Sequence, residues 1–197
     1  MRFIGFYDYT VILTYMSLVS AVMGMYLSDR GMLTGAVLCL VLSGICDAFD
    51  GIVARTKKNR TDDEKAFGIQ IDSLCDAVSF GVFPAVLCAN AGMKELGSVL
   101  ILAGYVLCAV IRLAFFNVLE GNRQKTEGGA NKTYRGLPVT SASMLLPAAF
   151  LLRPVLPPFI FLVLLHVLVA VTAFLFILDF SMKKPDWLKP FRKKEKV

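Results

Sequence analysis

The sequence predicts an all-α integral membrane protein: one domain over residues 1–197, built as a bundle of six transmembrane helices. Hydrophobic residues make up 56% of the chain and the mean hydropathy is +0.65, values too high for a soluble domain of this size. Six apolar runs approach the length of about 20 residues that a helix needs to cross the hydrocarbon. At these lengths, only a helix satisfies its own backbone hydrogen bonds within lipid.

The predicted spans follow one another along the chain, and a polar tail at residues 181–197 comes after them. The fifth span is the shortest, and Pro147 inside it interrupts regular helical hydrogen bonding. The six spans cover residues 10–27, 32–49, 69–89, 96–116, 137–152 and 159–178.

The third predicted span has distinct signals at its start and in its middle. Thr61 and Glu64 form a capping-box pattern, so we expect the helix to begin near Asp62, before it enters the lipid. The acidic residues there favour the positive N-terminus of the helix and need no catalytic role. Further along, Gly81 and Pro84 are expected to loosen or bend the helix within the membrane.

Basic residues are distributed very unevenly between the two sides of the predicted bundle. With the N-terminus inside, 18 of the 21 Lys and Arg residues lie on the cytoplasmic side, and Arg30, Lys94 and Arg153 lie outside. Both termini are therefore expected in the cytoplasm of a multi-pass protein of the cell membrane. This asymmetry accounts for the net charge of +6, so we expect no nucleic-acid partner. The aromatic and basic tail suits either an anionic membrane surface or solvent.

Four aspartates stand at the cytoplasmic ends of two predicted spans. Asp47 and Asp50 are three residues apart near the end of the second span, and Asp72 and Asp76 are four apart near the start of the third. Each pair lies on one face of its helix. Acidic residues in apolar segments are costly and usually functional. Without cations the four would repel one another, whereas with Mg²⁺ or Mn²⁺ they form the oxygen-rich site that these ions prefer.

The aspartates belong to a longer pattern of fixed spacing, which resembles the signature of the CDP-alcohol phosphotransferases. Two features depart from that family: the interval between Arg55 and Gly68 is longer than usual, and the first span lacks the usual Pro-Asn opening. In that span Thr14 is a partial match for the family's polar residue. Every residue that the signature specifies is present: Asp47, Asp50, Gly51, Ala54, Arg55, Gly68, Asp72 and Asp76.

The resemblance implies a metal-dependent transferase that forms a homodimer. Asp47, Asp50 and Asp72 would be ligands for a pair of Mg²⁺ or Mn²⁺ ions. Asp76 would complete the metal site and act as the base toward the acceptor hydroxyl. Arg55 would meet a phosphate oxygen, or else anchor its helix to lipid headgroups. The residues expected to bind the cytidine nucleotide are Asp47, Gly51, Ala54, Arg55, Gly68 and Thr14.

One branch of the family, whose members use serine as the acceptor, is the most similar. Residues 72–85, 112–117 and 135–138 resemble that branch, and Ser73 and Ala77 stand where members that use glycerol phosphate tend to carry Pro and Lys. The implied reaction joins CDP-diacylglycerol and L-serine to give phosphatidylserine and CMP, with the lipid tails remaining among the membrane lipids.

Three polar residues are candidates for holding the serine carboxylate or the lipid phosphate: Arg112, Asn117 and Arg135. Arg112 can equally be a cation that extends from its helix end to the interface. His166 is the only histidine and no acid shares its span, so we interpret it as a hydrogen-bonded core residue. Since no covalent nucleophile stands out, direct displacement on phosphorus is favoured.

Three other functions remain as alternatives to this interpretation. The first is that the chain catalyses another reaction of the family, such as the synthesis of phosphatidylglycerophosphate. A divalent-cation transporter would also gather acids, but it needs a polar path, and the outer halves of these spans are nearly all apolar. A non-catalytic scaffold would leave the signature residues unexplained.

The distribution of basic residues makes the orientation testable. A cysteine introduced between residues 56 and 65 should react with a membrane-impermeant thiol reagent only from the cytoplasmic side, because that loop holds part of the cationic cluster. Labelling of the same cysteine from outside in intact cells would overturn the orientation.

Overall fold

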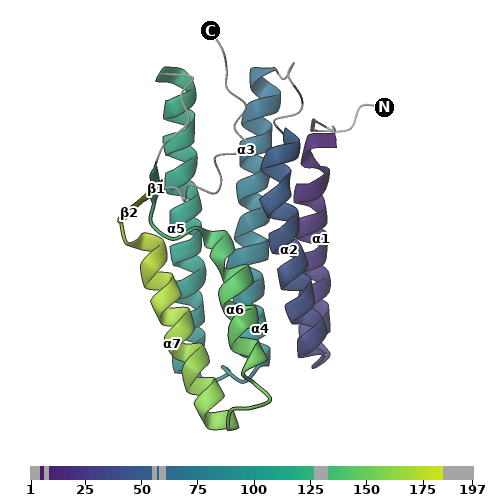
Figure 1. The fold of residues 1–197 in the computed structure, drawn as a ribbon, viewed down its shortest axis with the longest axis vertical. Helices are drawn as coiled ribbons and strands as arrows, with labels where there is room; N and C mark the ends of the chain where they lie inside the picture. The colour runs from purple at the N-terminus through teal and green to yellow at the C-terminus, as the bar shows by residue number, and fades with distance from the viewer. Residues whose placement is uncertain (1–4, 7–8, 55–56, 58–60, 127–132, 184–197) are drawn as a thin grey trace.

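The computed structural model describes residues 5–6, 9–54, 57, 61–126 and 133–183, and these residues form an elongated helical bundle (Figure 1). An all-helical membrane bundle is therefore confirmed as the fold class, with two short strands added. In chain order the elements are η1 (Tyr9–Val11), α1 (Ile12–Asp29), α2 (Leu33–Ala54), α3 (Asp62–Asp76), the π-helical η2 (Ala77–Val82), α4 (Phe83–Asn90), α5 (Leu96–Thr126), β1 (Thr133–Arg135), η3 (Val139–Ser141), α6 (Ala142–Leu151), α7 (Pro158–Ile177) and β2 (Ser181–Lys183).

Five helical segments of the described chain are long and apolar enough to cross a membrane. They are Ile12–Asp29, Leu33–Val53, Asp62–Asn90, Leu96–Leu119 and Pro158–Ile177, and they agree with five of the six predicted spans. The segment predicted as the fifth span contains only a shorter apolar helix, Val139–Leu151, with Pro147 inside α6. The count of six crossings therefore stays a prediction.

Two helices run further than the apolar pattern predicted. α2 continues to Ala54 rather than ending at residue 49, and α5 continues to Thr126 rather than ending at 116. The apolar runs are interrupted at Asp50 and at Asn117, but the helices continue beyond them. Residues 52–54 of α2 are apolar, and the end of α5 contains good helix formers such as Gln124 and Lys125. Strands β1 and β2 were not predicted; they pair antiparallel, with Tyr134 opposite Met182.

The start of α3 confirms the predicted capping box. The Glu64 backbone N–H donates to Thr61 Oγ1 at 3.2 Å, and the Thr61 N–H donates to Glu64 Oε2 at 2.9 Å. The helix begins at Asp62, as expected, and Lys57 forms an ion pair with Glu64 at 3.0 Å. The acidic residues of this turn therefore have a structural explanation.

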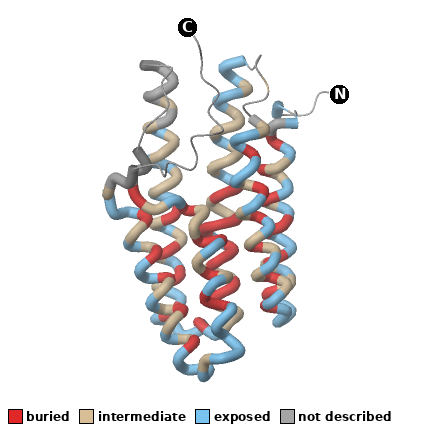
Figure 2. The backbone as a smooth tube through the Cα atoms, in the orientation of Figure 1, coloured by how far each residue is buried: buried red, intermediate tan, exposed pale blue. Residues whose placement is uncertain are grey.

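Small and hydroxyl-bearing residues allow α1 and α2 to pack closely. Ser20 Oγ donates to the Cys39 carbonyl at 2.9 Å, and Ser43 Oγ donates to the Ser17 carbonyl at 2.9 Å. In lipid, helices associate through close packing and such hydrogen bonds, since burial of apolar surface gives little advantage there. The buried residues lie on the inward faces of the helices and the exposed ones on the outside (Figure 2). The residues that α1 buries are Thr14, Ser17, Ser20, Ala21, Gly24 and Ser28.

The single histidine lies between α5 and α7, far along the chain from the aspartates. Its Nδ1 is 2.8 Å from the Leu162 carbonyl, which only accepts, so Nδ1 carries the hydrogen. Nε2 is then the acceptor for Ser98 Oγ, at 2.7 Å. The prediction that His166 is hydrogen-bonded is confirmed, and the residue is half-buried rather than part of the buried core.

Gly44 of α2 is a point of close approach to α6. A Cβ at this position would overlap the side chain of Ser143, whereas one at Gly104, in the middle of α5, would meet nothing within 4 Å. The two glycines therefore differ in the room around them although both lie within helices.

We expect Gly44→Ala to lower the midpoint of thermal unfolding in detergent, because overpacking costs about 1–3 kcal/mol. The matched control is Gly104→Ala, which should leave stability unchanged or raise it by about 0.5–1 kcal/mol through helix propensity. Equal stability of the two variants would contradict the close approach of α2 and α6.

Candidate active site

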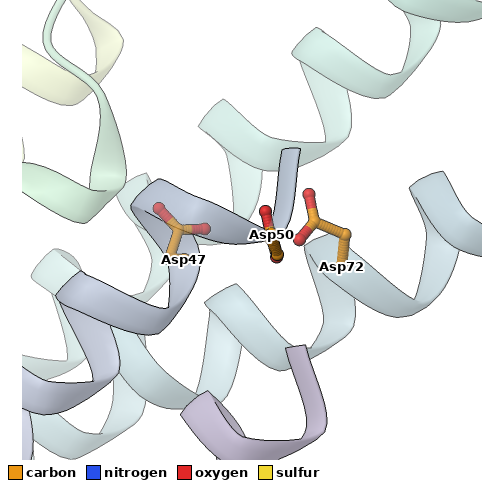
Figure 3. A group of neighbouring side chains, drawn as sticks. All are labelled: Asp47, Asp50 and Asp72. Atoms are coloured by element: carbon orange, nitrogen blue, oxygen red, sulfur yellow. The ribbon is translucent and has the colours of Figure 1, made fainter. Parts of the chain in front are cut away.

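Three carboxylates from two helices converge near the end of the bundle where α2 ends and α3 begins. Asp47 and Asp50 come from α2 and Asp72 from α3, with Asp50 lying between the other two (Figure 3). One oxygen from each residue lies within 4.8 Å of the others. The structure thus brings together residues that are 25 positions apart in sequence, from Asp47 to Asp72.

Asp76 is a fourth, buried carboxylate next to these three. It is the last residue of α3, is only 8% exposed, and lies within hydrogen-bonding reach of Asp47. Asp72 lies similarly beside Asp50. The four aspartates therefore form two adjacent pairs, each pair joining α2 to α3. Carboxylates this close repel one another when ionised unless a cation lies among them.

The donor set fits a divalent cation. Asp72 Oδ1 is buried and, among the described residues, has no hydrogen-bond partner. A buried acceptor left without a partner is costly, so an oxygen in this position is suited to coordinate an ion. A set made of carboxylate oxygens alone matches Mg²⁺ or Mn²⁺ better than the softer metals.

Thr14 supports the site from the neighbouring helix. Its Oγ1 donates to Asp50 Oδ2 at 3.0 Å, and both residues are buried, with Asp50 9% exposed. The bond helps to fix the orientation of the Asp50 carboxylate. The sequence identified Thr14 only as a candidate nucleotide ligand; that role stays a prediction.

The remaining residues predicted to bind the nucleotide lie at or near the end of α2 and in α3. A Cβ on Gly51 would meet nothing within 4 Å, so there is open space beside this residue. Gly68 is half-buried and one turn before Asp72. Ala54 ends α2, but its side chain lies outside the described part, and Arg55 lies outside the described residues altogether. Their contact with a nucleotide stays a prediction.

A small cavity of about 180 Å³ opens beside Asp76. On its other wall, the Arg112 guanidinium lies 4.1 Å from the centre of the Phe116 ring and donates to the Phe176 carbonyl at 3.4 Å. An acidic residue and a basic residue thus line the same cavity. The residues that line the cavity are Asp76, Arg112, Leu113, Phe116, Pro138, Val139 and Thr140.

The chain leading into η3 closes over Arg112 at a glycine. Gly136 has φ +66°, and its N–H donates to the Phe180 carbonyl at 2.6 Å. A Cβ here would overlap the Arg112 guanidinium and lie 2.8 Å from the Leu178 carbonyl. Only glycine fits this conformation and this approach without strain. The backbone of Arg135 lies in β1, but its side chain is outside the described part.

Asn117 contacts α3 instead of the cavity. Its Oδ1 accepts a hydrogen bond from Ser73 Oγ at 2.7 Å, and Ser73 directly follows Asp72 in the sequence. The sequence singled out both residues, as acceptor candidate and as branch marker, but gave no sign that they meet. A role for Asn117 in holding serine or phosphate stays a prediction.

A bundle of long apolar helices that gathers four carboxylates, two buried and two half-buried, has the features of an integral membrane protein with an acidic site. A family model described as CDP-alcohol phosphatidyltransferase matches residues 9–177. The chain belongs to the CDP-alcohol phosphatidyltransferase family, and the resemblance predicted from the signature residues is confirmed.

The similar curated proteins include several with serine in their names. An archaetidylserine synthase of Methanothermobacter thermautotrophicus is 38% identical over 134 residues, covering 67% of this chain and 53% of that protein. A CDP-diacylglycerol–serine O-phosphatidyltransferase of Saccharomyces cerevisiae is 40% identical over 116 residues, covering 57% and 41%. One from Bacillus subtilis is 33% identical over 124 residues, covering 61% and 63%. The match thus spans about half the length of these relatives. No solved structure matches the chain.

Metal binding by the four aspartates can be tested without measuring enzymatic activity. Asp50→Asn and Asp72→Asn should each weaken Mn²⁺ binding to the detergent-purified protein, measured by electron paramagnetic resonance. Thr14→Val should weaken it by about 10-fold or more, because losing a hydrogen bond that orients a ligand typically costs this much.

Asp63→Asn, which changes an exposed carboxylate in the capping turn of α3, is the control and should leave Mn²⁺ binding unchanged. Unaltered binding in Asp50→Asn and Asp72→Asn would rule out a cation between α2 and α3.

Proposed function

We propose that this chain transfers the phosphatidyl group of CDP-diacylglycerol to the hydroxyl of L-serine, giving phosphatidylserine and CMP. Membership of the family and the names of the similar proteins support this assignment. The observation that carries it is the cavity that Asp76 and Arg112 both line, with Asp76 beside the other three aspartates.

The size and charge of the cavity favour a small zwitterionic acceptor. Its volume of about 180 Å³ is below the roughly 300–1,000 Å³ that is usual for sites of larger ligands. Of the described residues that line it, Arg112 alone is cationic. One guanidinium matches the single carboxylate of serine, whereas the dianion of glycerol 3-phosphate calls for several cations.

In the proposed reaction, the hydroxyl oxygen of serine attacks the phosphorus next to diacylglycerol, and Asp76 accepts the proton of that hydroxyl. The new bond joins the serine oxygen to that phosphorus, and the bond from the phosphorus to the CMP oxygen breaks. A divalent cation, when bound, supplies charge that neutralises the diphosphate and the departing phosphate. Asp47, Asp50 and Asp72 would hold it, or a pair of Mg²⁺ or Mn²⁺ ions. Arg112 holds the serine carboxylate, and the leaving group departs as CMP.

The proposal includes a cellular arrangement. The carboxylates lie on the cytoplasmic side of the cell membrane, so the water-soluble acceptor arrives from the cytoplasm and the lipid tails stay in the bilayer. The distribution of basic residues supports this orientation. We further propose that residues 1–197 act as one domain and assemble as a homodimer with Arg55 and Arg135 near the bound phosphates; family resemblance supports these points.

An acceptor screen with purified protein tests the proposed function. With CDP-diacylglycerol and Mg²⁺ or Mn²⁺, L-serine should support CMP release, while glycerol 3-phosphate and inositol should not; excess EDTA should abolish release. Full activity in EDTA would refute the metal dependence. A preference for glycerol 3-phosphate would show that the reaction is the synthesis of phosphatidylglycerophosphate. The absence of CMP release with every acceptor would favour a transporter or a scaffold.

The role of Arg112 has its own variant in the same assay. Arg112→Ala should raise the KM for serine by about 10-fold or more, because a hydrogen bond to a charged group contributes about 1.5–3 kcal/mol. The KM for CDP-diacylglycerol should change much less. Arg30→Ala removes an exposed cation at the far end of α1 and is the control. Equal changes in both KM values for Arg112→Ala would contradict the assignment.

A further inference from the structure

A π-helical turn begins at the residue after Asp76. Residues 77–82 form this turn, and the Phe83 N–H donates to the Val78 carbonyl, five residues back. Pro84 accounts for the widening: it has no N–H to reach the Phe80 carbonyl four residues back, and its ring crowds that carbonyl in a regular α-helix. Turns of this kind are frequent at functional sites.

Tyr105 of α5 supplies the Phe80 carbonyl with a donor that Pro84 cannot give. The Tyr105 hydroxyl donates to the Phe80 oxygen at 2.7 Å. Both residues are almost fully buried, with Tyr105 2% exposed, and the Tyr105 ring lies 5.5 Å from that of Phe176. In this buried environment, water cannot take the place of either the hydroxyl or the carbonyl as a hydrogen-bond partner. The bond therefore holds α5 to the π-helical turn.

One face of α5 joins this hydrogen bond to the cavity. Tyr105, Ala109 and Arg112 follow one another at helical spacing, so they lie on the same side of α5. Tyr105 bonds to Phe80, and the Ala109 Cβ is 3.5 Å from the position that a Cβ on Gly81 would take. Arg112, two turns after Tyr105, faces the cavity with Asp76.

We propose that Tyr105 is a positioning residue for the acceptor site. By holding the Phe80 carbonyl it fixes the π-helical turn against α5, and so sets the separation between the Asp76 carboxylate and the Arg112 guanidinium. This inference rests on the proposed function, since it assigns Asp76 and Arg112 to the acceptor. Asp47 and Asp50 belong to α2, and Asp72 lies a full turn before the π-helical turn on α3, so cation and CDP-diacylglycerol binding depend less on Tyr105 than serine binding does.

Tyr105→Phe tests the proposal, because it removes only the hydroxyl. In the purified protein with CDP-diacylglycerol and Mn²⁺, the KM for serine should rise about 10-fold, as is typical when a residue that orients a binding group is changed. The KM for CDP-diacylglycerol and the Kd for Mn²⁺ should change much less. The matched control is Ser20→Ala, which also removes a buried hydroxyl that bonds a carbonyl of another helix; it should lower stability without changing the KM for serine.

Pro84→Ala separates positioning from stability. The new N–H can bond to the Phe80 carbonyl and allow a regular α-helical turn, so thermal stability should stay the same or increase while the KM for serine rises. Tyr105→Phe with wild-type kinetics, or with both KM values raised equally, would overturn the inference, as would Pro84→Ala with an unchanged KM for serine. Absence of serine-dependent CMP release from the wild-type protein, by contrast, refutes the proposed function itself.

Discussion

The close approach of four carboxylates inside a membrane bundle is the constraint on which the rest of the structure depends. Asp47 and Asp50 on α2 lie beside Asp72 and Asp76 on α3, in positions that are buried or half-buried, so solvent weakens their repulsion less than it would at the surface. Helices that carry such groups separate unless other interactions hold them together. The hydrogen bonds of Thr14, Ser20 and Ser43 join α1 to α2 and help to hold Asp50 in place. Between α2 and α3, where the carboxylates repel one another, the oxygen-only donor set suits a cation that offsets the charge.

The site has two sides that come from different parts of the chain. Helices α2 and α3 contribute the carboxylates, with α1 behind them. Helix α5, η3 and the end of α7 contribute the wall that carries Arg112. Asp76 belongs to both, since it lies beside Asp47 and lines the cavity. Under the proposed function, a change in the wall that carries Arg112 would therefore alter which hydroxyl is used and leave the carboxylate group intact.

The long helices, the start of α3 and the family were predictable from the sequence because they depend on the local spacing of residues. Apolar runs identified the long helices, Thr61 and Glu64 identified the start of α3, and the fixed intervals from Asp47 to Asp76 identified the family. The contacts between distant segments were not predictable. Nothing near Tyr105 in the sequence shows that its hydroxyl meets Phe80, and the bond between Ser73 and Asn117 spans 44 positions. The strands were missed because three residues each are too few to form a pattern.

The length of α7 gives the depth that the cavity would have in a bilayer. A helix rises about 1.5 Å per residue, so its 20 residues extend about 30 Å, which is the thickness of the hydrocarbon. Arg112 donates to the carbonyl of Phe176, in the last turn of that helix. With α7 spanning the hydrocarbon, Arg112 would therefore be level with the boundary between acyl chains and headgroups, where the phosphorus of a phospholipid lies. Under the proposed function, a lipid substrate would then react while it remains in its own leaflet, without being lifted toward water or drawn into the bilayer centre.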